Sequence, residues 1–146
     1  MIRVRVAVVL MKGDRILLVK HSKGGKEYWV LPGGGVEEGE SLADTAVREI
    51  KEETNLEIKV KKLVFISEAI PSDKHRHVID FFFTGEILSG EIKKGEEEIL
   101  KDIKFCPISA LSEIEFYPDI REELKRAHDT GFSEPTKFLG NKWEGK

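Results

Sequence analysis

The chain has 146 residues, of which 40% are hydrophobic and 35% are charged, and its formal net charge at pH 7 is -3. This length and composition predict a single globular domain, residues 1–146, that can bury a core of its own. The acidic balance offers no basic field for nucleic acid, and no apolar run approaches the roughly 18 residues of a membrane span, so neither partner is expected.

The cysteine content and the N-terminus predict where the protein works. The single cysteine, Cys106, excludes an internal disulfide and has no neighbouring His or second Cys that would make it a metal ligand. We therefore expect a buried, unreactive thiol. The first residues alternate in polarity and lack the pattern of a signal peptide. The expected location is the cytoplasm.

Three strands are predicted before residue 32. Residues 2–11 alternate and then become apolar, which indicates a strand that begins half exposed and ends buried. Residues 12–15 predict a tight turn, and residues 16–19 predict a return strand that forms a hairpin with the first. Residues 21–27 have the glycine and charge content of a flexible loop. Residues 28–31 predict a short strand.

A helix is predicted after a run of three glycines. Ser41 is the expected N-cap, and Asp44 can close an acidic capping box with it. Asn55 is expected to end the helix, because Asn tolerates the left-handed conformation of a C-cap. The apolar residues between these ends follow helical spacing: Leu42, Ala43, Ala46, Val47 and Ile50.

The rest of the chain is predicted to contain further strands. Residues 58–70, 77–88 and 99–108 are apolar or alternating and predict three of them. A polar break at 71–74 and a Gly-, Lys- and Glu-rich loop at 89–98 separate these strands.

The last part of the chain is predicted to be helical and then irregular. A short helical turn begins at Ser109, and a second helix begins at Pro118, with Pro at its first position. Residues 131–146 are expected to form a tail packed on the body through Phe138 and Trp143. This order of elements predicts an α/β fold, in which helices cover a mixed sheet.

Three glutamates gather on one side of the predicted helix. At about 100° per residue, Glu49, Glu52 and Glu53 share an arc of about 100° that borders the apolar face. An acidic face that is merely solvated usually lies opposite the core. Like charges at this spacing repel one another, and divalent cations would reverse the sign of that interaction.

The glycines before the helix add to this pattern. They let the backbone approach a bound group closely, and the carbonyl of Gly33 could supply one more oxygen ligand. Taken alone, an acidic helix is usually a solvated face and three glycines are usually a flexible turn. No Gly-Lys-Ser/Thr follows, so this is not a Walker A loop. The combination and its spacing carry the functional prediction.

The segment from Gly34 to Leu56 resembles the Nudix box. That pattern is Gly, five residues, Glu, seven residues, Arg-Glu-apolar, one residue, Glu-Glu, one residue, Gly-apolar. The single departure is Asn55, where the family usually has glycine, and both residues tolerate the left-handed cap. The matching residues are Gly34, Glu40, Arg48, Glu49, Ile50, Glu52, Glu53 and Leu56.

The resemblance implies the family's α/β/α sandwich with a mixed central sheet. It also implies hydrolysis of a diphosphate bond in a nucleoside diphosphate linked to another group, with two or more Mg²⁺ or Mn²⁺ ions. By position in the box, Glu49, Glu52 and Glu53 would hold the metals together with the carbonyl of Gly33 or its neighbour. Glu49 is the better candidate for the base that assists the attacking water.

Two further roles follow from the resemblance. Arg48 is expected to orient a carboxylate, either Glu52 or Glu40. Many family members take another acid from a loop across the pocket, and here Glu98 is the favoured candidate for it. A solvated charge run is the alternative for that loop, whose three acids are Glu96, Glu97 and Glu98.

Substrate residues are sought outside the box. Pro71 has a spacing that resembles the ADP-ribose pyrophosphatases, and an ordinary turn proline is the alternative. Arg76 could bind a phosphate with two hydrogen bonds, and Lys20 or His21 could do likewise. Tyr28 and Phe82 are preferred among the aromatic residues that could stack on a base or belong to the core: Tyr28, Trp29, Phe81, Phe82 and Phe83.

The leading hypothesis is a pyrophosphohydrolase of ADP-ribose or another ADP-sugar, acting on a small nucleotide. The alternatives are a nucleoside triphosphate pyrophosphohydrolase that clears damaged nucleotides, a dinucleoside polyphosphate hydrolase, and a Nudix module that binds nucleotides without catalysis. Exposed strand edges would allow a homodimer.

Overall fold

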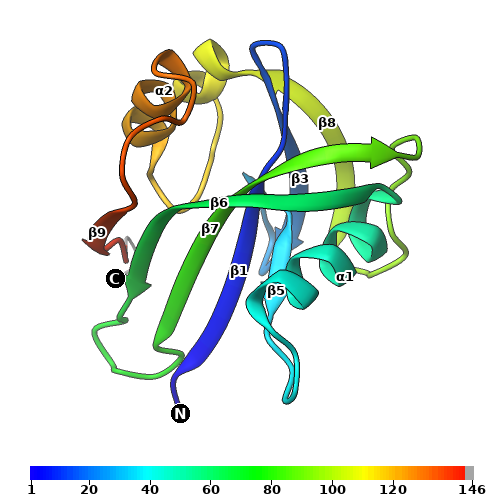
Figure 1. The fold of residues 1–146 in the computed structure, drawn as a ribbon. Coiled ribbons are helices and arrows are strands. Elements are labelled where there is room, and N and C mark those ends of the chain that lie inside the picture. Colours follow the sequence, from blue (N-terminus) through cyan, green and yellow to red (C-terminus); the bar gives the residue numbers. More distant parts are fainter. Residues whose placement is uncertain (144–146) are drawn as a thin grey trace.

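The computed structural model describes residues 1–143, which contain nine strands, two α-helices and one 3-10 helix (Figure 1). The helical elements are α1 (Leu42–Thr54), the 3-10 helix η1 (Ile108–Glu113) and α2 (Arg121–Asp129). The strands are β1 (Arg3–Val9), β2 (Met11–Lys12), β3 (Arg15–Lys23), β4 (Lys26–Val30), β5 (Gly33–Gly35), β6 (Glu57–Ala69), β7 (Val78–Ser89), β8 (Leu100–Pro107) and β9 (Lys137–Asn141).

The strands form two sheets. The larger has the order β5-β1-β7-β6-β9 and is mixed, because β1 runs parallel to β7 and β6 runs parallel to β9, whereas the other pairs are antiparallel. The smaller is antiparallel and contains β2, β3 and β4, with β8 also paired to β3. The predicted mixed α/β fold is confirmed, and its division into two sheets was not predicted.

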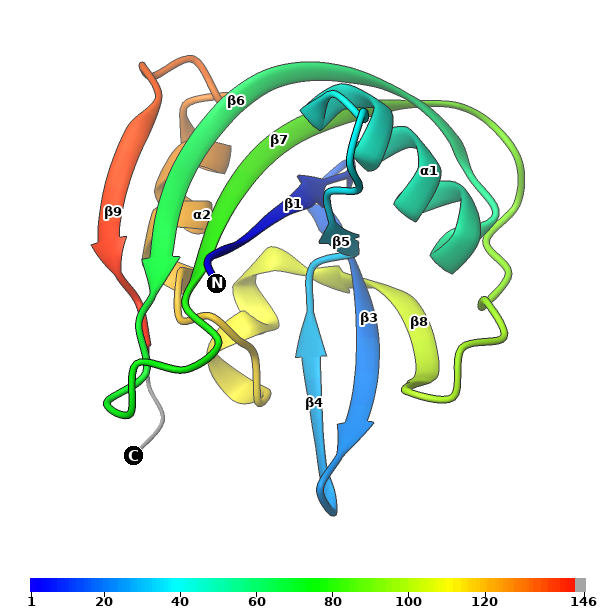
Figure 2. The same ribbon diagram turned by 90° about the horizontal axis from the view of Figure 1, so that it is seen from below.

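The side chains of β1 alternate between two cores. Val6 and Val8 belong to a buried cluster with Ile50 of α1. Ala7 belongs to the other cluster, which includes Leu124 of α2. The two helices accordingly lie on either side of β1 (Figure 2). Both faces of β1 are therefore buried along its second half, as its apolar sequence requires.

Helix α1 has the ends that the sequence predicts. The Ser41 hydroxyl accepts a hydrogen bond from the Asp44 amide at 3.0 Å, and the Asp44 carboxylate accepts one from the Ser41 amide at 3.1 Å. Asn55 is the C-cap with φ +69°, in the left-handed region. The capping box and Asn55 thus fix both ends of the helix that carries the box glutamates.

The hairpin predicted from residues 2–11 and 16–19 is only partly right. Within the first predicted strand, only the short segment β2 pairs with β3. Strand β1 pairs with β5 and β7 instead. The chain passes from the larger sheet to the smaller one between β1 and β2, at Leu10. Alternation of polarity indicates a strand but does not specify its partner. The prediction therefore paired this strand with the next one along the chain.

The flexible loop predicted at residues 21–27 is wrong. Strand β3 continues to Lys23, and β4 begins at Lys26. Gly24 and Gly25 alone make the turn, with φ +59° and +78°, which are the positive values that a tight hairpin turn requires. This hairpin places His21 opposite Tyr28 in register.

Helix α2 begins later than predicted. Its first residue is Arg121 and its N-cap is Ile120, so Pro118 lies before the helix rather than at its first position. The first helical hydrogen bond runs from the Leu124 amide to the Ile120 carbonyl at 2.9 Å.

The buried Cys106 is as predicted. No helix within residues 1–143 is long and apolar enough to cross a membrane.

The predicted tail contains a strand. Strand β9 runs parallel to β6 at the edge of the larger sheet, and Leu139 packs against the core. Packing through Phe138 is wrong, because alternation turns this side chain outward and leaves it 65% exposed. Residues 144–146 of the predicted tail lie outside the described residues. The assignment of residues 1–146 to one domain stays a prediction.

Candidate active site

The glycines of β5 let two elements come together. A Cβ on Gly33 would lie 2.0 Å from the carbonyl oxygen of Val6 on β1, and a Cβ on Gly34 would lie 2.3 Å from the carboxyl carbon of Glu49. The Gly33 amide donates a hydrogen bond to Glu53 Oε1 at 2.8 Å. Glycine is therefore needed here so that the strand can lie between β1 and the carboxylates of α1.

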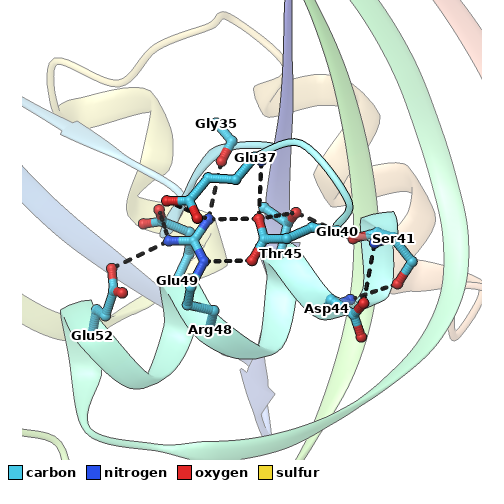
Figure 3. A network of polar contacts seen from close by, with 9 residues as sticks. All are labelled: Gly35, Glu37, Glu40, Ser41, Asp44, Thr45, Arg48, Glu49 and Glu52. Carbon is cyan, nitrogen blue, oxygen red and sulfur yellow. Dashed lines mark hydrogen bonds and ion pairs between the residues drawn. The ribbon is translucent and has the colours of Figure 1, made fainter.

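Arg48 is the centre of a polar network on α1 (Figure 3). Its Nε and Nη2 atoms donate to the two carboxylate oxygens of Glu40 at 2.6 and 2.9 Å. Its Nη1 donates to Glu49 at 2.8 Å and reaches Glu52 at 3.4 Å, and its Nη2 donates to the Gly35 carbonyl at 3.1 Å. One guanidinium thus connects the loop before α1 to two glutamates of the box.

Hydrogen bonds and burial shift the pKa values of the residues in this network. Hydrogen bonds from Arg48 lower the pKa of Glu40 to about 2, assisted by the Glu37 amide and the Thr45 hydroxyl. The hydrogen bond to Glu40 in turn raises the pKa of Arg48. Burial raises the pKa of Glu49, although the bond from Arg48 opposes this shift. Glu40 therefore remains ionised and Arg48 charged throughout the physiological pH range.

Three carboxylates converge beside this network. Oxygen atoms of Glu49, Glu52 and Glu97 all lie within 4.8 Å of one another. Glu97 comes from the loop at residues 90–99, between β7 and β8. Glu98, which the sequence favoured, does not belong to this group within residues 1–143. The structure therefore brings its neighbour, Glu97, to the box.

The position of Glu97 depends on how its loop meets the end of α1. The Gly95 amide donates to the carbonyl of Glu53 at 3.0 Å, and the Lys93 amide donates to the carbonyl of Thr54 at 2.9 Å. A Cβ on Gly95 would lie 2.3 Å from the carbonyl oxygen of Glu52. Only glycine allows so close an approach, and Glu97 follows two residues later.

Glu53 is the most buried of the box glutamates. It is 4% exposed, and this burial raises the pKa of its carboxyl to about 8, although the hydrogen bond from Gly33 opposes the shift. Its carboxylate form therefore needs nearby positive charge. The donor set of the site consists of carboxylate oxygens, which are the ligands that Mg²⁺ and Mn²⁺ prefer. These residues fit the predicted divalent cations.

A cleft begins next to the box. Arg5 of β1 is in register with Gly35 of β5 on one side and with Asp80 of β7 on the other. Arg5 and Asp80 line a hollow of about 240 Å³, which adjoins a second hollow of about 410 Å³ near the C-terminal end of the described chain. The two hollows share five residues, so they form one cleft: Tyr28, Ala69, Asp80, Tyr117 and Pro118.

The predicted substrate residues differ in their positions. Tyr28 lines both hollows, and Phe82, which is 1% exposed, lines the inner one. Lys20 instead forms an ion pair with Glu27 at 3.0 Å and does not line the cleft as the structure describes it. Arg76 is exposed in the loop between β6 and β7 and likewise lies outside the described walls of the cleft.

Sequence reasoning missed several cleft residues. Arg5 and Asp80 are charged residues inside strands that are otherwise largely apolar, and such an interruption is a signal that could have found them. Tyr117 and Trp143 lie on irregular segments, where the sequence carries no periodicity to place them. His21 was considered as a phosphate ligand, and it lines the inner hollow.

Comparisons with known proteins agree with this geometry. A family model described as the NUDIX domain matches residues 1–127. An ADP-ribose pyrophosphatase of Methanocaldococcus jannaschii is 37% identical over 114 residues, which cover 77% of this chain and 66% of that protein. Nudix hydrolase 5 of Arabidopsis thaliana is 35% identical over 98 residues, or 64% of this chain and 32% of that protein. Both matches span less than two thirds of the relative's length.

Solved structures share the fold. An ADP-ribose pyrophosphatase from Streptococcus suis has a TM-score of 0.73 and 27% identity, and the match covers 93% of this chain and 98% of that one. A NUDIX hydrolase from Nitrosomonas europaea has a TM-score of 0.78 and 21% identity, with 90% of each chain covered. The second likeness supports the fold alone.

Proposed function

Because the chain belongs to the Nudix hydrolase family, we propose that it hydrolyses the diphosphate bond of ADP-ribose or another ADP-sugar. The family relationship predicted from the box is confirmed, and the family includes proteins that act on small-molecule nucleotides. The proposal has one carrying observation: the oxygens of Glu49, Glu52 and Glu97 lie within 4.8 Å of one another. Such a cluster of like charges is expected where a divalent cation compensates it.

Glu49, Glu52 and Glu97 are the proposed ligands of Mg²⁺ or Mn²⁺, since Nudix hydrolases generally use such ions. Glu97 replaces Glu98 in this assignment. When bound, such cations would neutralise the negative charge of the phosphoryl oxygens and lower the pKa of the attacking water. Glu53 and the carbonyl of Gly33 are kept as further proposed oxygen ligands, in line with their place in the box.

The protein's own groups have distinct proposed roles in the reaction. Glu49 is the proposed base, because burial raises the pKa of its carboxyl and so makes its carboxylate a stronger proton acceptor. Arg48 holds the Glu49 carboxylate at 2.8 Å while its other nitrogens are fixed by Glu40. This arrangement orients the base and is expected to reduce its reorganisation during the reaction.

The proposed substrate rests on two further observations. Two of the compared proteins, at 37% and 27% identity, are named ADP-ribose pyrophosphatases. The cleft has an inner and an outer hollow with aromatic residues at their junction, a shape suited to a substrate with two ring-bearing parts. Arg5, at the inner end, is proposed to face the phosphates.

A substrate panel tests this function. The protein is incubated with Mg²⁺ and, separately, with ADP-ribose, deoxynucleoside triphosphates and diadenosine polyphosphates, and the products are identified. AMP and ribose phosphate are expected. Pyrophosphate release from the triphosphates would instead identify a nucleoside triphosphate pyrophosphohydrolase, and release of ATP or ADP would identify a dinucleoside polyphosphate hydrolase. No turnover of any compound would favour a Nudix module that binds nucleotides without hydrolysing them.

A further inference from the structure

Asp80 is an acidic residue on a mostly buried strand. It lies on β7 between Ile79 and Phe81, and its side chain is only 16% exposed. It lines both hollows of the cleft. A carboxylate at this depth is costly unless hydrogen bonds satisfy its oxygens.

The protein does not fully satisfy this carboxylate. Within residues 1–143 it forms an ion pair with Arg5, whose Nε lies 3.5 Å from Oδ1, and accepts no hydrogen bond. Burial raises the pKa of Asp80, and the positive charges of Arg5 and Arg3 only partly oppose this. Asp80 therefore offers acceptor capacity to whatever enters the cleft.

Aromatic residues stand around the same position. The rings of Tyr28 and Tyr117 meet edge to face, with centroids 5.6 Å apart and an angle of 79° between their planes. Both line the two hollows, and Trp143 lines the outer one. Such rings suit a planar, partly apolar ligand that carries a few polar atoms at its edge.

We propose that Asp80 determines base specificity by accepting a hydrogen bond from the exocyclic amino group of adenine, with the base held among Tyr28, Tyr117 and Trp143. This inference rests on the proposed function, and it adds the part of the substrate that the cleft recognises. An amino group donates a hydrogen bond to the carboxylate, whereas a keto oxygen at the same position would place its lone pairs against a negative charge.

The size of the discrimination follows from the charge of the acceptor. A hydrogen bond to a charged group is strong, and hypoxanthine can make one to Asp80 only if the base shifts to bring its N1–H to the position of the amino group. AMP is therefore expected to bind about 10- to 100-fold more tightly than IMP, which has a keto group in place of the amino group. These two nucleotides differ at the edge that Asp80 is proposed to read.

Calorimetric titration with AMP and IMP tests this without any bond cleavage. In the wild-type protein AMP is expected to be preferred. In Asp80→Asn the side-chain oxygen still accepts from the amino group, while its amide can donate to the keto oxygen. IMP binding is therefore expected to improve, and the preference is expected to fall to within about threefold. A gain in IMP affinity is a result that simple loss of structure does not produce.

The control is Glu86→Gln, the same chemical change on the same strand. Glu86 is exposed, pairs only loosely with Lys61 at 3.8 Å, and does not line the cleft. This variant is expected to keep the wild-type preference. Equal binding of AMP and IMP by the wild type, no binding of either, or an unchanged preference in Asp80→Asn would overturn the inference.

Failure of this inference can be told apart from failure of the proposed function. If the protein hydrolyses ADP-ribose and its hypoxanthine analogue at equal rates, the function stands and the role of Asp80 is wrong. If it prefers AMP to IMP through Asp80 yet hydrolyses no ADP-sugar, the base site stands and the proposed function is wrong.

Discussion

Arg48 and Glu40 form a two-point ion pair, with Nε 2.6 Å from Oε2 and Nη2 2.9 Å from Oε1. Glu40 precedes the helix and Arg48 lies in its middle, so the pair fixes the loop against α1 (Figure 3). The remaining nitrogen, Nη1, is thereby directed at Glu49. The planar guanidinium matches both oxygens of a carboxylate, which a lysine cannot do.

The first prediction concerns this pair. Arg48→Lys keeps the positive charge but loses the two-point geometry, so kcat/KM is expected to fall about 10- to 100-fold, as for other residues that orient a site. Steady-state kinetics on the identified substrate measures this. Lys51→Gln removes an exposed cation from the same helix and is the control. Wild-type activity in Arg48→Lys would show that the pair does not position Glu49.

The second prediction separates Glu97 from Glu98. Glu97→Gln is expected to weaken Mn²⁺ binding by at least about tenfold, because it removes a charged oxygen ligand from the cluster with Glu49 and Glu52. Glu98→Gln, the matched control, is expected to bind Mn²⁺ like the wild type. Titration calorimetry measures both affinities. Equal effects of the two changes would contradict the assignment.

The third prediction concerns catalysis by the box glutamates. Glu49→Gln and Glu53→Gln are each expected to lower kcat by several orders of magnitude, because the first loses the proposed base and the second loses a buried charge at the site. Circular dichroism should show that both variants fold. Near-full Mg²⁺-dependent activity in both variants would show that neither Glu49 nor Glu53 has its proposed role in catalysis.

The fourth prediction is a pH dependence of stability in the metal-free protein. Burial raises the pKa of Glu53 from 4.5 to about 8, so the folded state binds a proton that the unfolded state has already released. The free energy of unfolding should therefore fall as the pH rises from about 4.5 to about 8. Glu53→Gln has no such proton, so its free energy of unfolding should fall less over the same pH range. The amide oxygen of the glutamine can still accept the hydrogen bond from Gly33, so the variant is expected to fold.

Thermal unfolding followed from pH 5 to pH 8 in the presence of a chelator measures this difference. At pH 8 the metal-free Glu53→Gln protein is expected to be the more stable one. Parallel curves for the two proteins would mean that Glu53 is not the group responsible. Addition of Mg²⁺ should raise the stability of the wild type more than that of the variant, if Glu53 contributes to the cation site.

The fifth prediction concerns Gly95. A side chain there would meet the Glu52 carbonyl, so Gly95→Ala is expected to displace the loop that carries Glu97. Mn²⁺ affinity should fall by at least about tenfold, in the direction of the Glu97→Gln result. An unchanged affinity would mean that the loop tolerates the displacement.

The sequence predicted those features that depend on close neighbours along the chain. The caps at Ser41 and Asn55 and the grouping of the box glutamates need only the periodicity of one helix. The partner of β1 could not be predicted in this way, since β1 pairs with β7, far along the sequence. The choice of Glu97 over Glu98 depends on where Gly95 meets α1, which is a tertiary contact.

The same distinction explains the cleft. Tyr28 could be proposed from its residue type, but its neighbours come from other parts of the chain. Asp80 lies on a strand of the other sheet, and Tyr117 lies on the irregular segment before α2. Phosphate ligands were sought at Arg76, Lys20 and His21, and of these only His21 lines the cleft as the structure describes it. The structure also places Arg5, from within β1, at the cleft.

Strand β9 has a consequence for the walls of the cleft. The Lys142 amide donates to the Glu68 carbonyl at 2.7 Å, so pairing with β6 carries the chain onward to Trp143 at the outer hollow. The segment matched by the family model ends at residue 127 and already contains the carboxylate cluster. One wall of the cleft is thus supplied by residues beyond the matched segment. We therefore expect that exchange of that C-terminal strand would alter which ligands the outer hollow accepts and leave the carboxylate cluster unchanged.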